Sequence, residues 1–324
     1  MKIHPSRHPE TEIISLADDK LSRRKFLEFQ LKGMLWLAVG AASFYLPGKA
    51  RAAAVPDISV VKGQPGAAAR TAVAQLGGMQ AFVKPGDKVV IKPNMSFGNG
   101  TENATNTRPE VVRELVAMAK EAGASKIRVL DHTLSQPGPS IADIKAACRI
   151  FNEDIVHALN DYSFYKPAKI NDGWFGFNKT AVMKDVLQAD CLIAAPTAKC
   201  HHATGVSLAM KGMMGLVHDR WVMHQKGLDK AIVSLAAFLK PKLVVVDASR
   251  VLSTNGPRGP GKIIPMNTII ASADMVAADA KTVEMCTWYG KRFKPRQIKH
   301  IKLAHEAGLG RMDIENLVIQ QTEV

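Results

Sequence analysis

The sequence predicts an α/β fold, a mostly parallel sheet flanked by helices, that follows an N-terminal export signal. Short apolar runs rich in β-branched residues alternate with helical patterns along the chain, which is typical of βαβ units. Apolar residues make up 47% of the 324 residues, so the chain has enough of them to bury a core. A distinctive polar group directly follows each central strand. We expect a signal at 1–54 and a single α/β domain at 55–324.

The first half of the domain alternates strands and helices. A strand at 58–61 precedes an Ala-rich helix at 67–76, and the run KVVIK predicts a strand at 88–92. Pro109 begins a helix that Gly123 ends, since proline suits the first turn and glycine the position after the last. The other expected elements are a polar loop at 94–107, a strand at 126–130, a mostly helical segment at 140–159 and an irregular excursion or hairpin at 162–185.

The second half continues the alternation. The runs CLIAA, LVVV and TIIA predict strands at 191–195, 243–246 and 268–271. The remaining segments have helical spacing of their apolar residues, apart from a short final run that we expect to be an edge strand. The expected helices are 205–217, 228–239, 275–288 and 296–307, and the edge strand is 317–320.

The N-terminal region has the three parts of an export signal. The adjacent Arg23 and Arg24 precede Phe-Leu, an apolar run follows at 34–46, and small residues at 50–54 resemble a cleavage site. Paired arginines are typical of the twin-arginine type, which predicts the translocase as a partner and a periplasmic or otherwise exported location. The run of 13 residues is short of the roughly 20 that a spanning helix needs. The alternatives are an uncleaved signal that anchors the protein in the membrane and a coincidental basic patch.

The charge of the chain favours anionic partners. The formal net charge is +14, and without residues 1–54 it is still +10, from 34 Lys and Arg against 24 Asp and Glu. This balance suits anionic small molecules, an anionic membrane surface or an acidic protein. The sequence has no basic stretch interleaved with aromatic residues, so nucleic acid is not an expected partner.

The four cysteines are too few for a disulfide scaffold and contain no C-x-x-C pair, so a self-contained iron–sulfur cassette is absent.

Polar groups that follow the strands predict the site. In open α/β sheets ligands bind beyond the carboxyl ends of parallel strands, so these groups share one rim if the strands are parallel. Ser272 and Asp274 are most simply helix caps, Asn94 also suits a turn, and Arg250 also suits the surface. The groups are Lys92 and Asn94, Asp131 and His132, Lys199 with Cys200, His201 and His202, Asp247 with Ser249 and Arg250, and Ser272 with Asp274.

The segment 196–219 has the densest set of such residues. A helix that begins at Gly205 would present free backbone N–H groups, with Lys199 just before it and Lys211 on its second turn. This arrangement predicts a phosphate or carboxylate site, although the segment lacks the nucleotide P-loop pattern. The alternative is a tightly packed helix with two solvated lysines.

Metal-ligating residue types occur in the same region. Cys200 and His201 adjoin, and His132 follows another strand, so these three are candidate ligands for a transition metal. The spacing matches no structural zinc pattern, and a hydrogen-bonded active-site histidine without metal is the alternative. Loop 255–262, which carries Arg258, is either a lid or a long exposed turn.

Six motifs follow one another along the chain after the signal. They are IKPN at 91–94, RPE at 108–110, VLD at 129–131, PTAKCHHATGVSLAMKGMMG from Pro196, SADMVAADA from Ser272 and HEAGLG from His305. Their order and spacing resemble the domain of unknown function 362 family over nearly the whole chain after the signal. The resemblance implies an α/β fold and, because some members are fused to ferredoxin-like domains, redox surroundings. The Lys and His rim of the family is loosely similar to that of nickel-pincer lactate racemases. This chain has Lys211-Gly212 where relatives typically have a Lys-Asn pair.

Together these observations predict an exported protein that binds an anionic ligand or a metal-containing cofactor at the strand-end rim, as a redox-related enzyme with a redox partner protein. The alternative is a non-catalytic accessory subunit or assembly factor of an exported redox complex. The candidate catalytic residues are His201, Lys199 and Asp131, the ligand-binding residues Lys92, Asn94, Lys211 and Arg250, and the metal ligands Cys200, His201 and His132.

Overall fold

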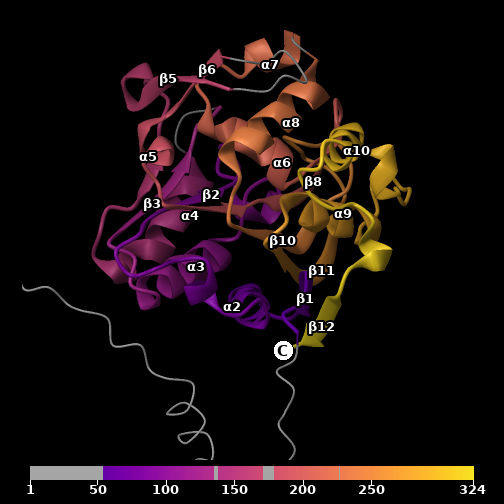
Figure 1. The fold of residues 1–324 in the computed structure, drawn as a ribbon, viewed down its shortest axis with the longest axis horizontal. Coiled ribbons are helices and arrows are strands. Elements are labelled where there is room, and N and C mark those ends of the chain that lie inside the picture. The colour runs from indigo at the N-terminus through magenta and orange to yellow at the C-terminus, as the bar shows by residue number, and fades with distance from the viewer. Residues whose placement is uncertain (1–53, 135–137, 171–178, 226) are drawn as a thin grey trace, which may run out of the picture. The chain divides into compact units, whose positions relative to one another are not determined.

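A mixed sheet of ten strands forms the centre of the protein in the part that the computed structural model describes, which is residues 54–134, 138–170, 179–225 and 227–324 (Figure 1). Residues Ala54–Val324 form one compact unit. The main path of the sheet runs through β12 (Ile319–Glu323), β1 (Ile58–Lys62), β11 (Ile263–Ser272), β10 (Leu243–Leu252), β7 (Cys191–Ala195), β2 (Lys88–Pro93), β3 (Lys126–Asp131) and β4 (Val156–Ala158).

Most strands are parallel, as the sequence predicts. β10, β7, β2, β3 and β4 run in one direction, and β12 lies parallel to β1 at the edge. β11 is antiparallel to both of its neighbours. The prediction that all five polar groups share one rim is therefore wrong for Ser272 and Asp274, which lie at the opposite end. Asp274 instead caps the next helix by accepting hydrogen bonds from Val276 N and Ala277 N.

Helices cover both faces of the sheet, because alternate residues of each strand point to opposite sides. Val89 and Ile91 pack in one buried cluster, whereas Val90 packs in the other. Helices α2 (Pro65–Gln75), α3 (Pro109–Glu121) and α4 (Pro139–Cys148) cover the first face. The second face is covered by α6 (Ala209–Gly212), α8 (Leu228–Leu239), α9 (Met275–Met285) and α10 (Lys299–Glu306), as Figure 1 shows.

Two predicted helices are wrong in part. The segment expected to be helical at 140–159 ends as α4 at Cys148, because Asn152 takes a left-handed conformation (φ 52°) and the chain then enters β4. The segment expected as one helix at 205–217 begins as a strand, β9 (Gly205–Ser207), which pairs antiparallel with β8 (Thr197–His201). Only Ala209–Gly212 of that segment is α-helical, followed by a 3₁₀ turn at Met213–Leu216.

Smaller elements complete the unit. β5 (Tyr165–Lys169) and β6 (Lys179–Met183) pair antiparallel, in agreement with the expected hairpin, and the short α5 (Lys184–Leu187) follows. α7 (Trp221–Gln225) precedes α8. None of the helices in the described part of the chain has the length and apolar content that a membrane crossing requires. The predicted export signal falls outside the described residues.

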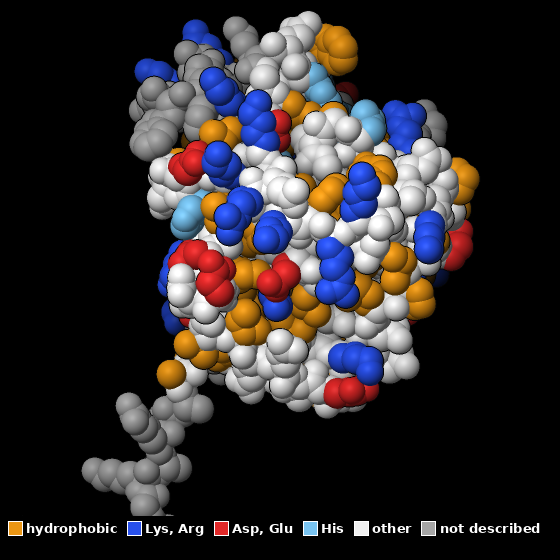
Figure 2. Space-filling view, turned by 90° about the vertical axis from the view of Figure 1, so that its right-hand side faces the viewer, with side chains coloured by type: hydrophobic (Ala, Val, Ile, Leu, Met, Phe, Trp, Pro, Cys, Tyr) orange, Lys and Arg blue, Asp and Glu red, His pale blue; other side chains and the backbone are white. Residues whose placement is uncertain are grey.

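Basic side chains on one face of the molecule are dispersed. Figure 2 shows Lys and Arg spread singly over this face, with Asp and Glu among them rather than gathered at one end. Positive charge is concentrated instead in a cavity at the ends of the central strands.

Candidate functional site

A cavity of about 410 Å³ opens where β2 and β8 end. Its wall includes five Lys and Arg side chains and three histidines but no Asp or Glu among the described residues. The predicted site residues Lys92, Asn94, Lys199, His201 and Lys211 all line it. The other lining residues are Ser96, Phe97, Leu134, His202, Ser207, Gly212, Met214, Gly215, Arg220, Trp221, His224, Pro257 and Arg258.

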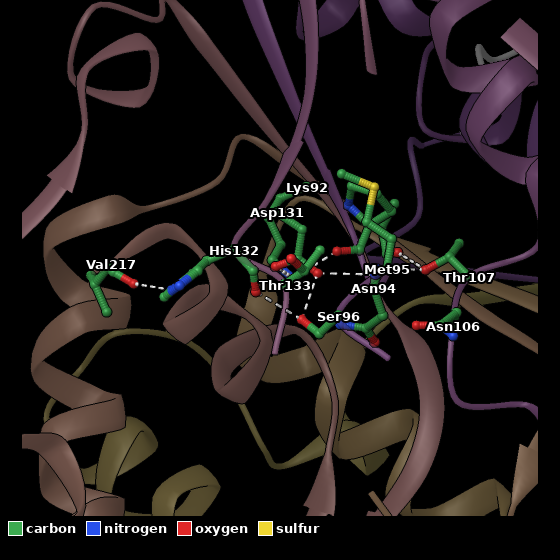
Figure 3. Close-up of polar contacts among 12 residues, drawn as sticks. Lys92, Asn94, Met95, Ser96, Asn106, Thr107, Asp131, His132, Thr133 and Val217 are labelled. Atoms are coloured by element: carbon green, nitrogen blue, oxygen red, sulfur yellow. Dashed lines mark hydrogen bonds and ion pairs between the residues drawn. The ribbon is translucent and has the colours of Figure 1, made fainter. Parts of the chain in front are cut away.

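A buried ion pair forms the floor of this cavity (Figure 3). Lys92 Nζ lies 3.2 Å from Asp131 Oδ1 and donates a hydrogen bond of 2.6 Å to the carbonyl of Pro93. Asp131 Oδ2 accepts hydrogen bonds from Met95 N (2.9 Å) and Ser96 Oγ (2.8 Å). Burial lowers the pKa of Lys92, and the Asp131 carboxylate opposes that effect. Asp131 therefore lies beneath the cavity wall and positions Lys92.

Asn94 joins the ends of two strands. Its side-chain Oδ1 accepts a hydrogen bond of 3.0 Å from Thr197 N at the start of β8, and its backbone N donates to Thr107 Oγ1 at 2.8 Å. Thr107 Oγ1 in turn donates to the carbonyl of Ala195. Because Oδ1 is engaged, the Nδ2 amide is the end of Asn94 that remains for a ligand.

Lys199 is brought into the cavity by β8 rather than by a loop. Its side chain is 3% exposed, its Nζ donates to the carbonyl of Thr105, and the ammonium lies 5.2 Å from the centre of the Phe97 ring. Burial, and then the charge of Lys92, lower the pKa of Lys199 to about 7. The polar loop after β2 thus folds over Lys199 and supplies both of these contacts.

Lys211 and Arg220 add charge from the second face of the sheet. Lys211 projects from α6, and burial, followed by the charges of Arg220 and Lys92, lowers its pKa to about 8. Arg220 precedes α7 and donates a hydrogen bond of 3.1 Å to the carbonyl of His132. Among the described residues, neither Lys211 nor Arg220 has a carboxylate within 4 Å.

His201 is neutral in the folded protein. Burial, and then the charge of Lys211, lower the pKa of His201 to about 2. Its Nδ1 accepts a hydrogen bond of 3.1 Å from Ala203 N, so the proton of the neutral ring lies on Nε2. The ring of His201 stacks on that of His202 at 4.8 Å. His201 can therefore donate a hydrogen bond from Nε2, whereas an imidazolium acid is disfavoured.

The three predicted metal ligands are not brought together. His132 stacks on His218 at 5.7 Å, and its Nδ1 lies 3.3 Å from the carbonyl of Val217. Figure 3 shows the His132 ring directed toward Val217. Cys200 is fully buried, and its Sγ accepts a hydrogen bond from Gly256 N. No group of three His, Cys, Asp or Glu among the described residues is arranged to hold a metal ion. The geometry thus gives no support to a metal site made of these three residues.

Arg250 lies away from the cavity. It is part of β10, which continues past the expected end at Val246, and its Nη2 lies 3.9 Å from Asp247 Oδ2. Asp247 also accepts hydrogen bonds from Ser249 and from Arg108 N. Asp247 and Arg250 therefore belong to a separate buried polar cluster.

The sequence reasoning did not find Arg220, Trp221 and Phe97, and it considered His224 only as a histidine that follows the candidate metal ligands. None of Arg220, Trp221 and His224 follows a strand, and the expected long helix at 205–217 would have placed them elsewhere. The chain reaches the cavity with Arg220 because β9 and a single helical turn reverse its direction. Arg258, on the loop that the sequence predicts to be either a lid or an exposed turn, lines the cavity. Asn99 Nδ2 donates a hydrogen bond to the carbonyl of Arg258.

The fold and the cavity define an α/β protein with a cationic pocket at the strand ends. Residues 89–284 match the family described as Domain of unknown function (DUF362), and the chain belongs to this family. A thylakoid-associated protein of Synechocystis sp. is 28% identical over 225 residues, which cover 66% of this chain and 67% of that protein.

Two solved structures are more distantly similar. One is the lactate racemase apoprotein from Thermoanaerobacterium thermosaccharolyticum, with 14% identity, a TM-score of 0.44 and 69% of this chain covered. The other is a crystal structure of a protein from Thermotoga maritima, with 13% identity, a TM-score of 0.39 and 76% covered. The chain spans 55% and 60% of their lengths, respectively. Neither similarity bears on the chemistry of this chain.

Proposed function

We propose that the protein binds a small anionic compound, a phosphate or carboxylate, in the strand-end cavity. The observation that supports this function is the charge of the wall, which has five Lys and Arg side chains and no Asp or Glu among the described residues. A buried charge that lacks a counter-charge is costly, so cations that face one another need negative charge from another source. A bound anion supplies it.

The geometry suits a ligand of metabolite size. A volume of about 410 Å³ lies within the usual range for small-molecule pockets. Lys211, Arg220 and the Nε2 proton of His201 are hydrogen-bond donors, and each hydrogen bond to a charged group contributes about 1.5–3 kcal/mol. Phe97 and Met214 add apolar wall, so the ligand has an uncharged part as well as the anionic group.

Thermal unfolding with and without anions tests this function. Inorganic phosphate and citrate should each raise the melting temperature relative to sodium chloride of equal ionic strength. The free energy gained by mass action is about 2.7 kcal/mol at one hundred times the dissociation constant. Lys211→Met should remove most of this shift, because it deletes a donor of the cavity wall.

The matched control is Lys230→Met, which changes an exposed lysine of α8 and should keep the full shift. Without ligand, Lys211→Met should be as stable as the original protein or more so, because a buried cation among cations opposes folding. If no phosphate or carboxylate raises the melting temperature of the original protein, the proposal is wrong. A full shift in Lys211→Met would place the site elsewhere.

We also infer that the protein is exported, on the basis of Arg23 and Arg24 before the apolar run at 34–46. The protein could be exported with the ligand already bound, or it could bind the ligand after export. Both orders are consistent with a cavity that forms on folding. Export can be tested without knowledge of the ligand.

A further inference from the structure

The three lysines of the cavity differ in what stabilises their charge. Lys92 has the Asp131 carboxylate at 3.2 Å, whereas no carboxylate lies within 4 Å of Lys199 Nζ among the described residues. The hydrogen-bond partner of Lys199 is the neutral carbonyl of Thr105. With a side chain only 3% exposed, Lys199 also has little water to solvate an ammonium group. Lys211 likewise has no carboxylate within 4 Å among the described residues but is partly exposed, so Lys199 is the lysine that is buried without a counter-charge.

The surroundings of Lys199 favour its uncharged, nucleophilic form, because the amine is buried and shares the cavity wall with four other Lys and Arg side chains and no Asp or Glu among the described residues. Burial and the neighbouring Lys92 lower its pKa to about 7, so a large part of the amine is uncharged near neutral pH. An uncharged lysine amine adds to carbonyl groups, and the proximity of another cation is one known way to produce it. A single hydrogen bond from Nζ to Thr105 leaves the nitrogen lone pair free and limits the rotation of the amine.

We propose that Lys199 forms an imine with the keto or aldehyde group of a small anionic carbonyl compound, such as a 2-keto acid, held in the cavity. The proposal rests on the anion-binding function above. Lys211 and Arg220 would hold the carboxylate or phosphate, and the carbonyl carbon would lie against Lys199 Nζ. The cavity wall thus provides both the binding charge and the reacting amine.

The bonds balance without a further reactant. The Nζ lone pair attacks the carbonyl carbon, and the electrons of the C=O π bond move to oxygen, which gives a carbinolamine. The nitrogen then forms a double bond to carbon as the C–O bond breaks, and the oxygen leaves as water with the two protons that the amine carried. Lys211, whose pKa is about 8, can give a proton to the departing hydroxyl and recover it from the nitrogen.

Reductive trapping tests the imine. The protein is incubated with pyruvate and sodium cyanoborohydride at pH 7.5, and the intact mass and the peptides are measured. We expect one reduced pyruvyl adduct per chain, located on Lys199. Inorganic phosphate in excess should slow the labelling several-fold, because it competes for the cations of the cavity. Pyridoxal 5′-phosphate, an aldehyde that carries a phosphate, serves as a second probe and adds the absorbance of its imine.

Two variants separate the amine from its charge. Lys199→Arg keeps a cation but cannot form an imine, and should lose the adduct, whereas Lys230→Arg, an exposed position of α8 outside the cavity, should still be labelled at Lys199. Peptide mapping of the original protein decides the question even where a variant fails to fold. Adducts spread over exposed lysines, or no adduct on Lys199, overturn the imine. If phosphate still raises the melting temperature in that case, the anion site stands alone, and if it does not, both proposals fail.

Discussion

Gly215 shows how closely the chain packs around the ion pair on the cavity floor. A Cβ atom at this position would meet Asp131 Oδ1 and come within 2.7 Å of Lys92 Cε. The carbonyl of Gly215 also accepts a hydrogen bond of 2.9 Å from His132 N, so the backbone cannot retreat without losing it. Gly215→Ala should therefore lower the free energy of unfolding by about 1–3 kcal/mol through overpacking, as measured by urea denaturation.

Gly66→Ala is the matched control for that substitution. Gly66 lies in α2, where a Cβ would have its nearest neighbour at an ordinary 3.6 Å. Alanine is the better helix former by roughly 1 kcal/mol, so this variant should be as stable as the original protein or more stable. An unchanged midpoint for Gly215→Ala would mean that the Lys92–Asp131 pair has room to move.

The two buried lysines also predict how stability depends on pH. The folded-state pKa of Lys199 is about 7 and that of Lys211 about 8, against an ordinary value of 10.5. Above pH 7 the unfolded chain thus holds protons that the folded chain has released, and the free energy of unfolding rises with pH. Each group contributes at most about 1.4 kcal/mol per pH unit.

Urea denaturation between pH 7 and 8.5 measures this slope. Above pH 9 the buried thiols act in the opposite direction, because burial raises the pKa of Cys148 and Cys191 to about 11. The double variant Lys199→Met with Lys211→Met should flatten the rise, while Lys230→Met should retain it. An identical slope in the double variant would show that both amines stay charged in the folded protein.

At the scale of elements, the spacing of apolar residues predicts most strands of the sheet correctly. It fails to predict the type of element where a segment is buried on all sides. The strand at 191–195 and the helix at 228–239 match β7 and α8 residue for residue. The apolar spacing in 205–217 suggests a helix, but almost every residue there is buried, so the spacing cannot distinguish a helix from a strand and turn. Gly205, at φ 77°, closes the β8–β9 hairpin and is the local signal that was available.

The direction of a strand is a long-range property. TIIA in β11 reads as a strand from its own residues, but whether it runs parallel to β10 depends on the connection and on its pairing with β1. The sequence therefore predicts cavity residues correctly only where they follow strands that prove to be parallel. The sequence predicts Lys92 and Asn94 at the end of β2 and Lys199 shortly after β7. It does not predict Arg220, because the place of Arg220 depends on how the chain turns after β9.

At the scale of the whole molecule, we expect the charge of the cavity and the N-terminal signal to be independent features. The described residues that line the cavity lie between Lys92 and Arg258 in the sequence. Deleting or altering the signal should therefore leave ligand-induced stabilisation unchanged. This independence allows the location of the protein to be tested without knowledge of its ligand.

Replacement of both Arg23 and Arg24 by lysine is the test of export. The twin-arginine pathway reads the two guanidinium groups, so lysines keep the positive charge but should leave the chain full-length in the cytoplasm. Fractionation of cells and immunoblotting measure the amount outside the inner membrane. Arg51→Lys, a similar change beside the expected cleavage site, should leave export intact. Equal amounts of the original protein and the double-lysine variant outside the membrane would contradict the twin-arginine assignment, and retention of both in a membrane fraction would favour an uncleaved anchor.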